Sequence, residues 1–395
     1  MPKLLQINVT ANWGSTGRIA EGIGECAINN GWESWIAYGR GNPISKSHLI
    51  SIGTVFDMYL HGIQTRLLDN HGLASKAVTK SFIKQVKHLK PDVIHLHNIH
   101  GYYINYEILF DFLKEWGGPV IWTLHDCWSF TGHCAYYTYS KCDFWQTHCH
   151  NCPQLGNYPA SILIDRSIRN FDDKRNAFFG LKNLFLTPVS NWLEGELKKS
   201  FLKDYPTTVI HNGIDIINFR PTPVIRKEKK HILGVASVWD TRKGLNEFKI
   251  LRKQLPLDYK ITLIGLSPKQ IHALPDGING VERTNSISEL AEWYSKATVF
   301  VNPTLEDTFP TTNLEALACG TPVITYRTGG SPEAIDSNTG IVVPYHDTHS
   351  LGNAIKYVCD EKPFNSYDCR HRAENLFDQK KAFTEYINLY HSILS

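Results

Sequence analysis

The sequence predicts an α/β protein with two doubly wound, Rossmann-like domains. Three observations lead to this fold class. Short apolar strands alternate with amphipathic helical stretches along the chain, which is the pattern of parallel sheets. The chain has 395 residues, more than the roughly 100–200 of one ordinary domain. A charged, proline-bearing segment at Arg220–Lys230 divides it near the middle and is the best candidate for a linker.

The predicted elements follow the chain in order. The strands of the first half are expected at Leu4–Val9, Ser34–Tyr38, Val93–His97, Val120–Leu124, Leu184–Val189 and Val209–His211. Those of the second half are expected at Ile232–Ser237, Lys260–Ile264, Val299–Pro303, Val323–Tyr326 and Gly340–Val343. Helices are expected at Gly17–Asn29, Ser75–Lys87, Leu245–Gln254, Ile287–Lys296 and Thr312–Cys319, with a long terminal helix over Arg372–Leu394. The domains are predicted to cover residues 1–218 and 219–370, and residues 371–395 to pack back towards the first domain.

Composition narrows the class of function. Hydrophobic residues make up 42% of the chain and charged residues 20%, which excludes a disordered protein. The net charge is 41 basic minus 38 acidic residues, or +3, which is too small to indicate nucleic acid as the main partner. No apolar run approaches the ~20 residues of a membrane helix, and the N-terminus lacks a signal-peptide pattern. A cytoplasmic protein is therefore expected.

The segment Asn302–Glu333 concentrates polar and glycine residues beyond a strand end, where open α/β sheets bind ligands. Asp307 lies in the predicted loop, a helix is expected to begin near Thr311 or Thr312, and Glu315 lies about one turn into it. The N–H groups of a helix start can bind phosphate, and carboxylates on either side can hold sugar hydroxyls. The alternative is structural, since Thr312 and Glu315 have the spacing of a capping box and Asp307 can be an ordinary loop acid.

The order of the motifs resembles the group 1 (family 4) retaining nucleotide-sugar glycosyltransferases. The matching residues are Asp307-Thr-Phe309-Pro310, Glu315-Ala-Leu-Ala-Cys-Gly320-Thr-Pro322-Val323, Gly329-Gly330-Ser-Pro-Glu333, Asn212-Gly213-Ile214-Asp215 and Lys243-Gly244. The closest subgroup is that of the colanic-acid and exopolysaccharide transferases. The resemblance implies the GT-B architecture, in which two Rossmann-like domains face a central cleft. The first domain would bind the acceptor and the second the nucleotide sugar.

The resemblance also implies a set of site residues. Those expected to contact the donor are Gly14, Ser15, Thr16, Gly17, Arg242, Lys243, Glu306, Asp307, Thr308, Phe309, Pro310, Thr311, Thr312 and Glu315. Those expected to take part in transfer are His125, Asp126, Lys243, Asp307 and Glu315. Two departures leave alternatives open. The first acid of the motif is Asp307 with Glu306 beside it, and the family arginine falls on Val238, so that Arg242 is the candidate to replace it.

Two further histidines, His95 and His97, share one face of a predicted strand. A metal pair and a set of hydrogen-bonded side chains at the strand end are the alternatives for them. No D-x-D motif occurs in the chain, and the resemblance implies no catalytic metal.

Nine cysteines are present, and five of them lie between Cys127 and Cys152. The odd count and the absence of an export signal argue against a disulfide framework. The spacing C-x7-C-x6-C-x2-C of Cys134, Cys142, Cys149 and Cys152 suggests a structural zinc, which could hold together an aromatic, loop-like insert at residues 127–158. Reduced or weakly paired cysteines are the alternative.

The expected function is therefore transfer of a sugar from a UDP- or GDP-sugar to a glycan or lipid-linked acceptor, in bacterial surface polysaccharide biosynthesis. Peripheral contact with the inner face of the cytoplasmic membrane would accompany a lipid-linked acceptor. The competing hypotheses are a sugar-nucleotide epimerase or phosphorylase on the same architecture, and an inactive, zinc-stabilised binding protein. A P-loop kinase is excluded, since G-x4-G-K-[ST] does not occur.

Overall fold

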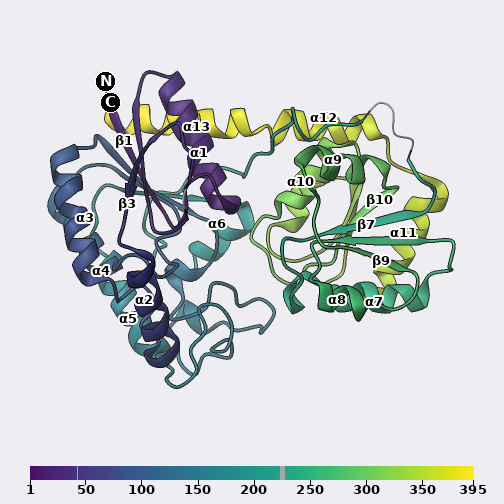
Figure 1. Ribbon diagram of the computed structural model, residues 1–395, viewed down its shortest axis with the longest axis horizontal. Coiled ribbons are helices and arrows are strands. Elements are labelled where there is room, and N and C mark those ends of the chain that lie inside the picture. The colour runs from purple at the N-terminus through teal and green to yellow at the C-terminus, as the bar shows by residue number, and fades with distance from the viewer. Residues whose placement is uncertain (42, 223–226) are drawn as a thin grey trace. The chain divides into compact units, whose positions relative to one another are not determined.

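A computed structural model describes residues 1–41, 43–222 and 227–395. The chain divides into two compact units (Figure 1): unit 1 comprises Met1–His211 with Phe383–Ser395, and unit 2 comprises Asn212–Ala382. Part of the predicted linker, residues 223–226, lies outside the described residues. Within the described residues, no helix has the length and apolar character needed to cross a membrane.

Unit 1 is built on a six-stranded parallel sheet with the order β3-β2-β1-β4-β5-β6. Its strands are β1 (Lys3–Asn8), β2 (Glu33–Tyr38), β3 (His48–Ser51), β4 (Val93–Leu96), β5 (Val120–Leu124) and β6 (Leu184–Pro188). Its helices are α1 (Gly14–Asn29), α2 (Val55–Leu68), α3 (Lys76–Leu89), α4 (Tyr106–Trp116), α5 (Ser167–Phe178) and α6 (Asn191–Leu197). Strands β4 and β5 are buried along their whole length, as is typical of central strands covered on both faces.

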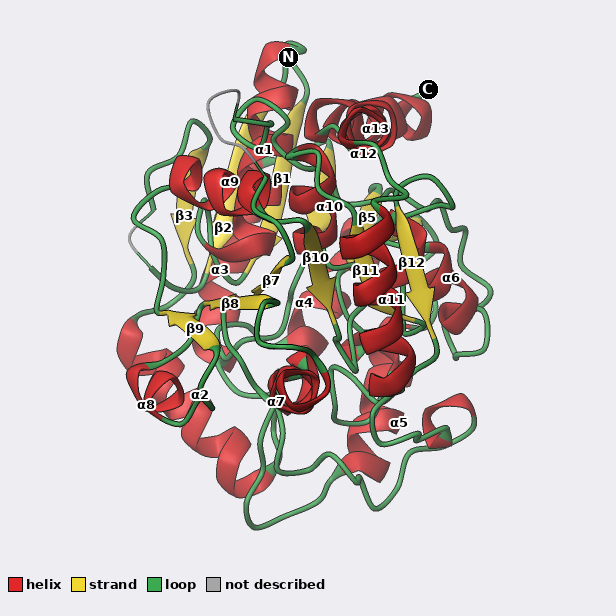
Figure 2. Cartoon of the chain, turned by 90° about the vertical axis from the view of Figure 1, so that its right-hand side faces the viewer, coloured by secondary structure: helices red, strands yellow, loops and turns green. Residues whose placement is uncertain are grey.

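Unit 2 repeats the plan with the order β12-β11-β10-β7-β8-β9 (Figure 2). Its strands are β7 (His231–Val235), β8 (Lys260–Ile264), β9 (Ile278–Val281), β10 (Val299–Asn302), β11 (Val323–Tyr326) and β12 (Gly340–Val343). Its helices are α7 (Leu245–Gln254), α8 (Pro268–His272), α9 (Ile287–Lys296), α10 (Thr311–Ala318), α11 (Thr348–Glu361) and α12 (Ser366–Leu376), and α13 (Gln379–Leu394) begins in it. The two parallel sheets confirm the predicted fold class.

Numbered within its own unit, each sheet has the strand order 3-2-1-4-5-6. The strand order reverses between the first and fourth strands of such a sheet, and a crevice opens there at the carboxyl ends. In unit 1 this switch point lies between β1 and β4, and in unit 2 between β7 and β10. The loops that follow these four strands therefore occupy the positions at which a doubly wound fold binds ligands.

The predicted single helix over Arg372–Leu394 is wrong, because the chain forms α12 and α13 with a break between them. At the break Ile214 pairs with Asp378 in a parallel bridge, its N–H donating to the Phe377 carbonyl at 2.7 Å and its own carbonyl accepting from Gln379 N–H at 3.0 Å. A Cβ on Gly213 would lie 2.3 Å from the Cα of Gln379. The Asn-Gly-Ile-Asp element is thus shaped for this close backbone contact.

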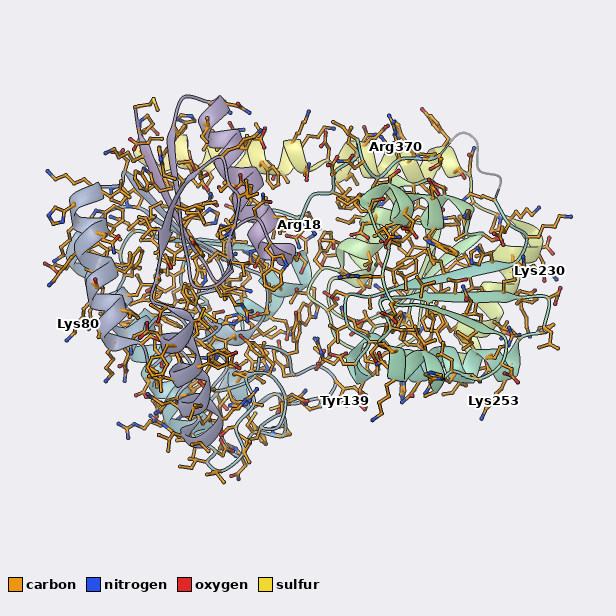
Figure 3. All side chains as sticks on the ribbon, viewed as in Figure 1. Arg18, Lys80, Tyr139, Lys230, Lys253 and Arg370 are labelled. Atoms are coloured by element: carbon orange, nitrogen blue, oxygen red, sulfur yellow. The ribbon has the colours of Figure 1, made fainter. Side chains whose placement is uncertain are left out.

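Arg370 of α12 fixes the same region (Figure 3). Its guanidinium donates to the carbonyls of Phe219 at 2.7 Å, Ala318 at 2.9 Å and Ile216 at 2.9 Å. One side chain thereby joins α12, the end of α10 and the segment that enters unit 2. Because α10 carries the predicted donor motif at its other end, α12 helps to hold that motif in place.

Three predictions of strands need correction. The structure adds β3 and β9, which were not predicted, and it has no strand at Val209–His211, where an isolated bridge pairs Leu186 with Thr207 instead. Both added strands are sheet edges with half-exposed residues. Edge strands need only one buried face and lack a continuous apolar run.

Candidate functional site

The switch point of unit 2 holds an ion pair. Lys243, in a short 3-10 turn at Thr241–Lys243 after β7, places its Nζ 2.5 Å from Oδ2 of Asp307, which lies in the loop after β10. The side chains are 24% and 13% exposed respectively. The structure thus brings together two residues that are 64 positions apart in the chain, and both remain within reach of solvent.

Two close backbone approaches shape this site. A Cβ on Gly244 would lie 2.3 Å from the Pro303 carbonyl oxygen, and one on Gly329 would lie 1.6 Å from that of Asp307. Both glycines also have positive φ, +78° and +51°, which other residues rarely adopt. The Leu305 N–H donates to the Arg242 carbonyl at 2.6 Å. The glycines of the motifs therefore let three loops pack around the Lys243–Asp307 pair.

The neighbouring acids differ in burial. Glu306 is fully buried, whereas the side chain of Asp307 is 13% exposed and contacts Lys243. Asp307 Oδ1 also accepts from the Phe309 N–H at 3.3 Å. Of the two carboxylates, Asp307 is thus the one that a ligand at the switch point can reach.

The remaining predicted donor residues continue from this loop into α10. Thr308, Phe309 and Pro310 are buried, and the Thr308 carbonyl accepts from Gly330 N–H at 3.1 Å. Helix α10 begins at Thr311, with Pro310 as its N-cap residue, so Thr311 and Thr312 occupy its first turn. Their N–H groups belong to the donors that a helix start leaves without partners in the helix.

The alternative role of Glu315 in a capping box is wrong. Because α10 begins at Thr311, Glu315 is its fifth residue rather than its third, and no side-chain cap hydrogen bond forms. Instead, Oε2 of Glu315 accepts from the buried Tyr294 hydroxyl of α9 at 2.8 Å. The carboxylate is therefore held from the core side.

The predicted substitute for the missing family arginine has an acidic neighbour. Arg242 Nη2 lies 3.1 Å from Asp240 Oδ2, and the Arg242 side chain is 31% exposed. Val238, at the position of the family arginine, is 66% exposed. Arg242 is thus close in sequence to Lys243 but is already paired.

In unit 1, the predicted residues Gly14–Gly17 form the first turn of α1, which begins three residues earlier than predicted. Gly14 has φ +68°, and a Cβ on Gly17 would lie 2.6 Å from Oγ1 of Thr10. The Thr16 hydroxyl accepts from the Asn8 side chain at 3.2 Å. Both glycines are therefore required by the local backbone, in addition to the functional role that the resemblance implies.

His125 and Asp126 follow β5. Asp126 Oδ2 lies 2.9 Å from Nε2 of His100, and its Oδ1 accepts from the Trp128 N–H at 2.9 Å. Burial alone would raise the pKa of Asp126, but His100 and the Trp128 N–H outweigh it and lower the pKa below the usual value. Burial lowers the pKa of His125 to about 4. The pair therefore combines a carboxylate with a neutral imidazole.

Two residues at this site were missed by sequence reasoning. His100 bridges from Asp126 to the Tyr158 hydroxyl, which lies 2.9 Å from its Nδ1. The only sequence signal was the cluster of histidines at the end of β4, and nothing marked Tyr158. Their contact depends on the fold of the long insert after Asp126.

Of the two readings of His95 and His97, the structure supports hydrogen-bonded side chains. His95 contacts the Tyr390 hydroxyl at 2.6 Å and the Thr123 hydroxyl at 2.8 Å. His97 contacts the Gln6 side chain at 3.0 Å and His125 at 3.2 Å. All four ring nitrogens thus have protein partners, so they do not form a metal pair.

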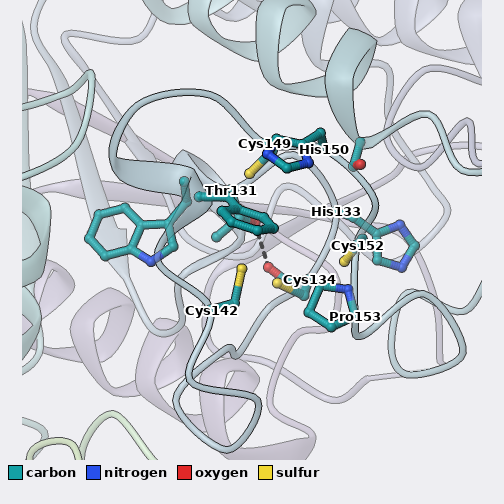
Figure 4. A pocket seen from close by; sticks show the side chains of 11 residues that line it. Thr131, His133, Cys134, Cys142, Cys149, His150, Cys152 and Pro153 are labelled. Atoms are coloured by element: carbon teal, nitrogen blue, oxygen red, sulfur yellow. Dashed lines mark hydrogen bonds between the residues drawn. The ribbon is translucent and has the colours of Figure 1, made fainter.

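The cysteine-rich insert gathers its thiols around one small pocket (Figure 4). Its lining includes Cys134, Cys142, Cys149 and Cys152 together with His133. Within the described residues, however, no three His, Cys, Asp or Glu side chains are arranged to hold a metal ion. All nine cysteines lie within the described residues, and none of them forms a disulfide. The prediction of a structural zinc is therefore not supported.

The insert has other means of holding together. Lys174 of α5 is buried, donates to the carbonyls of Trp128 at 2.6 Å and Thr131 at 2.9 Å, and lies 3.7 Å over the Trp128 ring. His133 pairs with Asp69 at 2.7 Å, with both side chains fully buried. Contacts of this kind hold the insert to α5 and to the end of α2.

The comparisons with known proteins point to glycosyltransferases. Residues 229–361 match the family described as "Glycosyl transferases group 1". The chain is 23% identical over 416 residues to the putative colanic acid biosynthesis glycosyl transferase WcaC of Escherichia coli (strain K12), covering 99% of this chain and 100% of that protein.

Solved structures give the same fold. Sucrose-phosphate synthase from Thermosynechococcus elongatus superimposes with a TM-score of 0.73 at 18% identity, over 100% of this chain and 99% of that chain. Anabaena Alr3699/HepE in complex with UDP-glucose does so with a TM-score of 0.67 at 12% identity, over 99% of each chain. The fold is thus that of the GT-B glycosyltransferases. Residues 229–361 therefore match a glycosyl transferases group 1 domain, and the resemblance predicted from the motifs is confirmed.

Proposed function

We propose that this enzyme transfers a hexosyl group from a nucleotide-diphosphate sugar to a hydroxyl of a glycan or lipid-linked acceptor, with retention of anomeric configuration. The observation that carries the proposal is the Lys243–Asp307 pair at the switch point of unit 2. It lies one short loop before the start of α10, where N–H groups favour phosphate. WcaC supports a role in surface polysaccharide biosynthesis, and the UDP-glucose complex of HepE supports a UDP-sugar donor.

Unit 2 is proposed to bind the donor. Lys243 and the α10 start at Thr311–Thr312 would neutralise the diphosphate, Asp307 would accept from sugar hydroxyls, and Glu315 from the ribose. Asp307 is preferred over Glu306 because Glu306 is fully buried. Arg242 would add a second, partly neutralised cation. For unit 1, Gly14–Gly17 are proposed as a further donor contact, and His125 and Asp126 as the contact to the reacting hydroxyls.

In the proposed reaction the acceptor oxygen forms a bond to the anomeric carbon on the face from which the diphosphate leaves. The bond to the diphosphate breaks, and the departing phosphate oxygen takes the proton of the acceptor hydroxyl. Negative charge thus grows on the diphosphate, where preorganised cations and N–H groups stabilise it most. The chain lacks a D-x-D motif, and Lys243 would supply the charge that a metal supplies in enzymes with that motif. We place the enzyme in the cytoplasm, with peripheral contact to the inner membrane face for a lipid-linked acceptor.

A thermal-shift screen of UDP- and GDP-sugars tests the proposal. We expect one donor to raise the melting temperature, because a ligand that binds only the folded state stabilises it. Glu315→Ala should abolish the shift, whereas Glu361→Ala, at the exposed end of α11, should keep it. No shift with any nucleotide would contradict the proposal.

A further inference from the structure

A chain of three side chains crosses the switch point of unit 1. It runs from Gln6 in β1 through His97, just after β4, to His125, just after β5. Gln6 Oε1 lies 3.0 Å from His97 Nε2, and His97 Nδ1 lies 3.2 Å from His125 Nε2. These strands are neighbours in the sheet. Gln6 and His97 are almost fully buried, so they act on a ligand only through His125.

The far end of this relay fixes the direction of its hydrogen bonds. The side-chain amide of Gln6 lies 2.8 Å from the carbonyl oxygen of Ala20. A backbone carbonyl can only accept, so the group facing it is the NH₂ of Gln6. The amide oxygen of Gln6 must then face His97 and accept from its Nε2–H.

The tautomer of His97 in turn determines that of His125. Burial lowers the pKa of His97 well below 6.5, and lowers that of His125 to about 4, so both rings are neutral near pH 7. A neutral imidazole carries one proton. With that proton on Nε2, His97 Nδ1 is an acceptor, and the nitrogen that faces it, His125 Nε2, must be the donor.

We infer that Gln6 and His97 are positioning residues that hold His125 as the neutral tautomer with its proton on Nε2. His125 therefore presents Nδ1 as a hydrogen-bond acceptor. On the proposed function, on which this part of the inference rests, His125 accepts from a sugar hydroxyl and does not donate a proton to the leaving group. This hydrogen bond orients the sugar, while the proton of the reacting hydroxyl passes to the departing phosphate as proposed above.

The backbone around His97 supports such a role. Its N–H donates to the Ile7 carbonyl at 2.9 Å, and its carbonyl accepts from the Trp122 indole at 3.0 Å. His97 is thus held between β1 and β5 from both sides. A rigid partner of this kind fixes the orientation of the group that it contacts.

His95 provides the contrast within the same strand. Its ring lies 4.1 Å from that of His97, centroid to centroid, and is equally buried. Its partners, however, are the hydroxyls of Tyr390 and Thr123, which can each donate or accept. Both ring nitrogens of His95 are thus engaged by these hydroxyls. His95 serves as a matched control.

Nitrogen NMR of the full-length protein labelled with ¹⁵N-histidine tests the inference without any substrate. The His125 signals are identified by their loss in His125→Gln. At pH 7 we expect a neutral ring with the proton on Nε2 and an unprotonated Nδ1. A ring with its proton on Nδ1, or one protonated on both nitrogens, would overturn the inference. This outcome is independent of whether the proposed transfer reaction is correct.

Kinetics of position 97 provide the second test. In His97→Leu the acceptor is lost while an apolar side chain fills the space, and we expect kcat to fall ~10–100-fold with little change in KM, as when partners that orient a functional histidine are removed. His97→Asn places an oxygen near the former Nδ1 and should recover most of the loss. His95→Leu should lower the melting temperature but not kcat.

The outcomes separate the two ideas. Equal losses in kcat for His97→Leu, His97→Asn and His95→Leu would show a packing effect and overturn the positioning role. If the wild-type protein transfers no sugar while NMR shows the expected tautomer, the relay stands and the proposed function fails.

Discussion

The two units share one strand order but place opposite chemistry at their switch points. In unit 2 the loops after β7 and β10 bring together Lys243 and Asp307. In unit 1 the corresponding strands β1 and β4 bring together Gln6 and His97, both neutral. Charged side chains in a partly exposed crevice suit a charged ligand, whereas a buried neutral relay suits the placing of a hydroxyl. On the proposed function, the same topology would thus serve the diphosphate in one unit and hydroxyl groups in the other.

The difference extends to how each functional group is held. Lys243 and Asp307 form an ion pair, so on the proposed function a diphosphate that attracts the ammonium would also free the carboxylate for a sugar hydroxyl. His125, in contrast, is held by a relay that ends at a backbone carbonyl. One site can rearrange when its ligand arrives, and the other is organised in advance.

The largest expected effect is that of Lys243→Ala. It removes the cation at the switch point of unit 2, and we expect kcat to fall ~10²–10³-fold, the usual cost of losing one preorganised group that stabilises charge in the transition state. Initial rates with the donor found in the thermal-shift screen measure it. Lys253→Ala, on the exposed face of α7, is the matched control. A change below about twofold in Lys243→Ala would remove the main distinction between the two units.

Acid should affect unit 1 before unit 2. Burial lowers the pKa of five histidines in unit 1, namely His61, His71, His95, His97 and His125. In unit 2 the pKa of His231 is lowered, and His133 of unit 1, beside Asp69, shifts the other way. Below about pH 6.5 the unfolded chain therefore binds more protons than folded unit 1. The contribution of these histidines to the stability of unit 1 is therefore fully present above about pH 6.5 and is lost as the pH falls towards about 4.

At pH 5, each such histidine should lower the free energy of unfolding by about 1–2 kcal/mol. Hydrogen exchange, corrected for the intrinsic effect of pH and compared between pH 7 and pH 5, should show loss of protection first in β1, β4 and β5. His61→Gln, which cannot titrate, should weaken the pH dependence. Equal loss of protection in both units would contradict the comparison.

The sequence allowed the sheets to be predicted because central parallel strands are buried throughout and mostly apolar, as in β4 and β10. It did not reveal β3 and β9, whose edge positions permit exposed polar residues. The capping box failed for a local reason. Pro310 takes the N-cap position, so the helix begins one residue before the threonine that fits the motif.

The site residues likewise divide into those that the sequence could predict and those that it could not. Motif residues such as Lys243 and Asp307 were predicted because their spacing in the chain is distinctive. Gln6 and Tyr158 have no local pattern, and His100 is marked only by the histidine cluster at the end of β4. The roles of all three depend on contacts between segments far apart in sequence. The thiol spacing suggested zinc, but Lys174 from a later helix contacts the same insert. Such long-range contacts cannot be predicted from the pattern of one segment.

A smaller effect should separate the two acids of the donor loop. Asp307→Asn removes the charge that pairs with Lys243 and would contact the sugar, and we expect kcat/KM to fall ~10-fold or more, the worth of a charge-assisted hydrogen bond. Glu306 lies in the core, so Glu306→Gln should lower the melting temperature more than the rate. Comparing the two variants by initial rates and thermal unfolding distinguishes them. The reverse pattern would assign the sugar contact to Glu306.

The smallest expected effect concerns the support of Glu315. Tyr294→Phe removes the hydroxyl that donates to the carboxylate at 2.8 Å and keeps the aromatic packing. We expect nucleotide binding to weaken by about 1 kcal/mol, or roughly fivefold in Kd, the usual net worth of one hydrogen bond. Titration calorimetry with the donor nucleotide measures it, with the exposed Tyr367→Phe as control. An unchanged Kd would mean that the carboxylate needs no such support, and that prior organisation of the site is confined to unit 1.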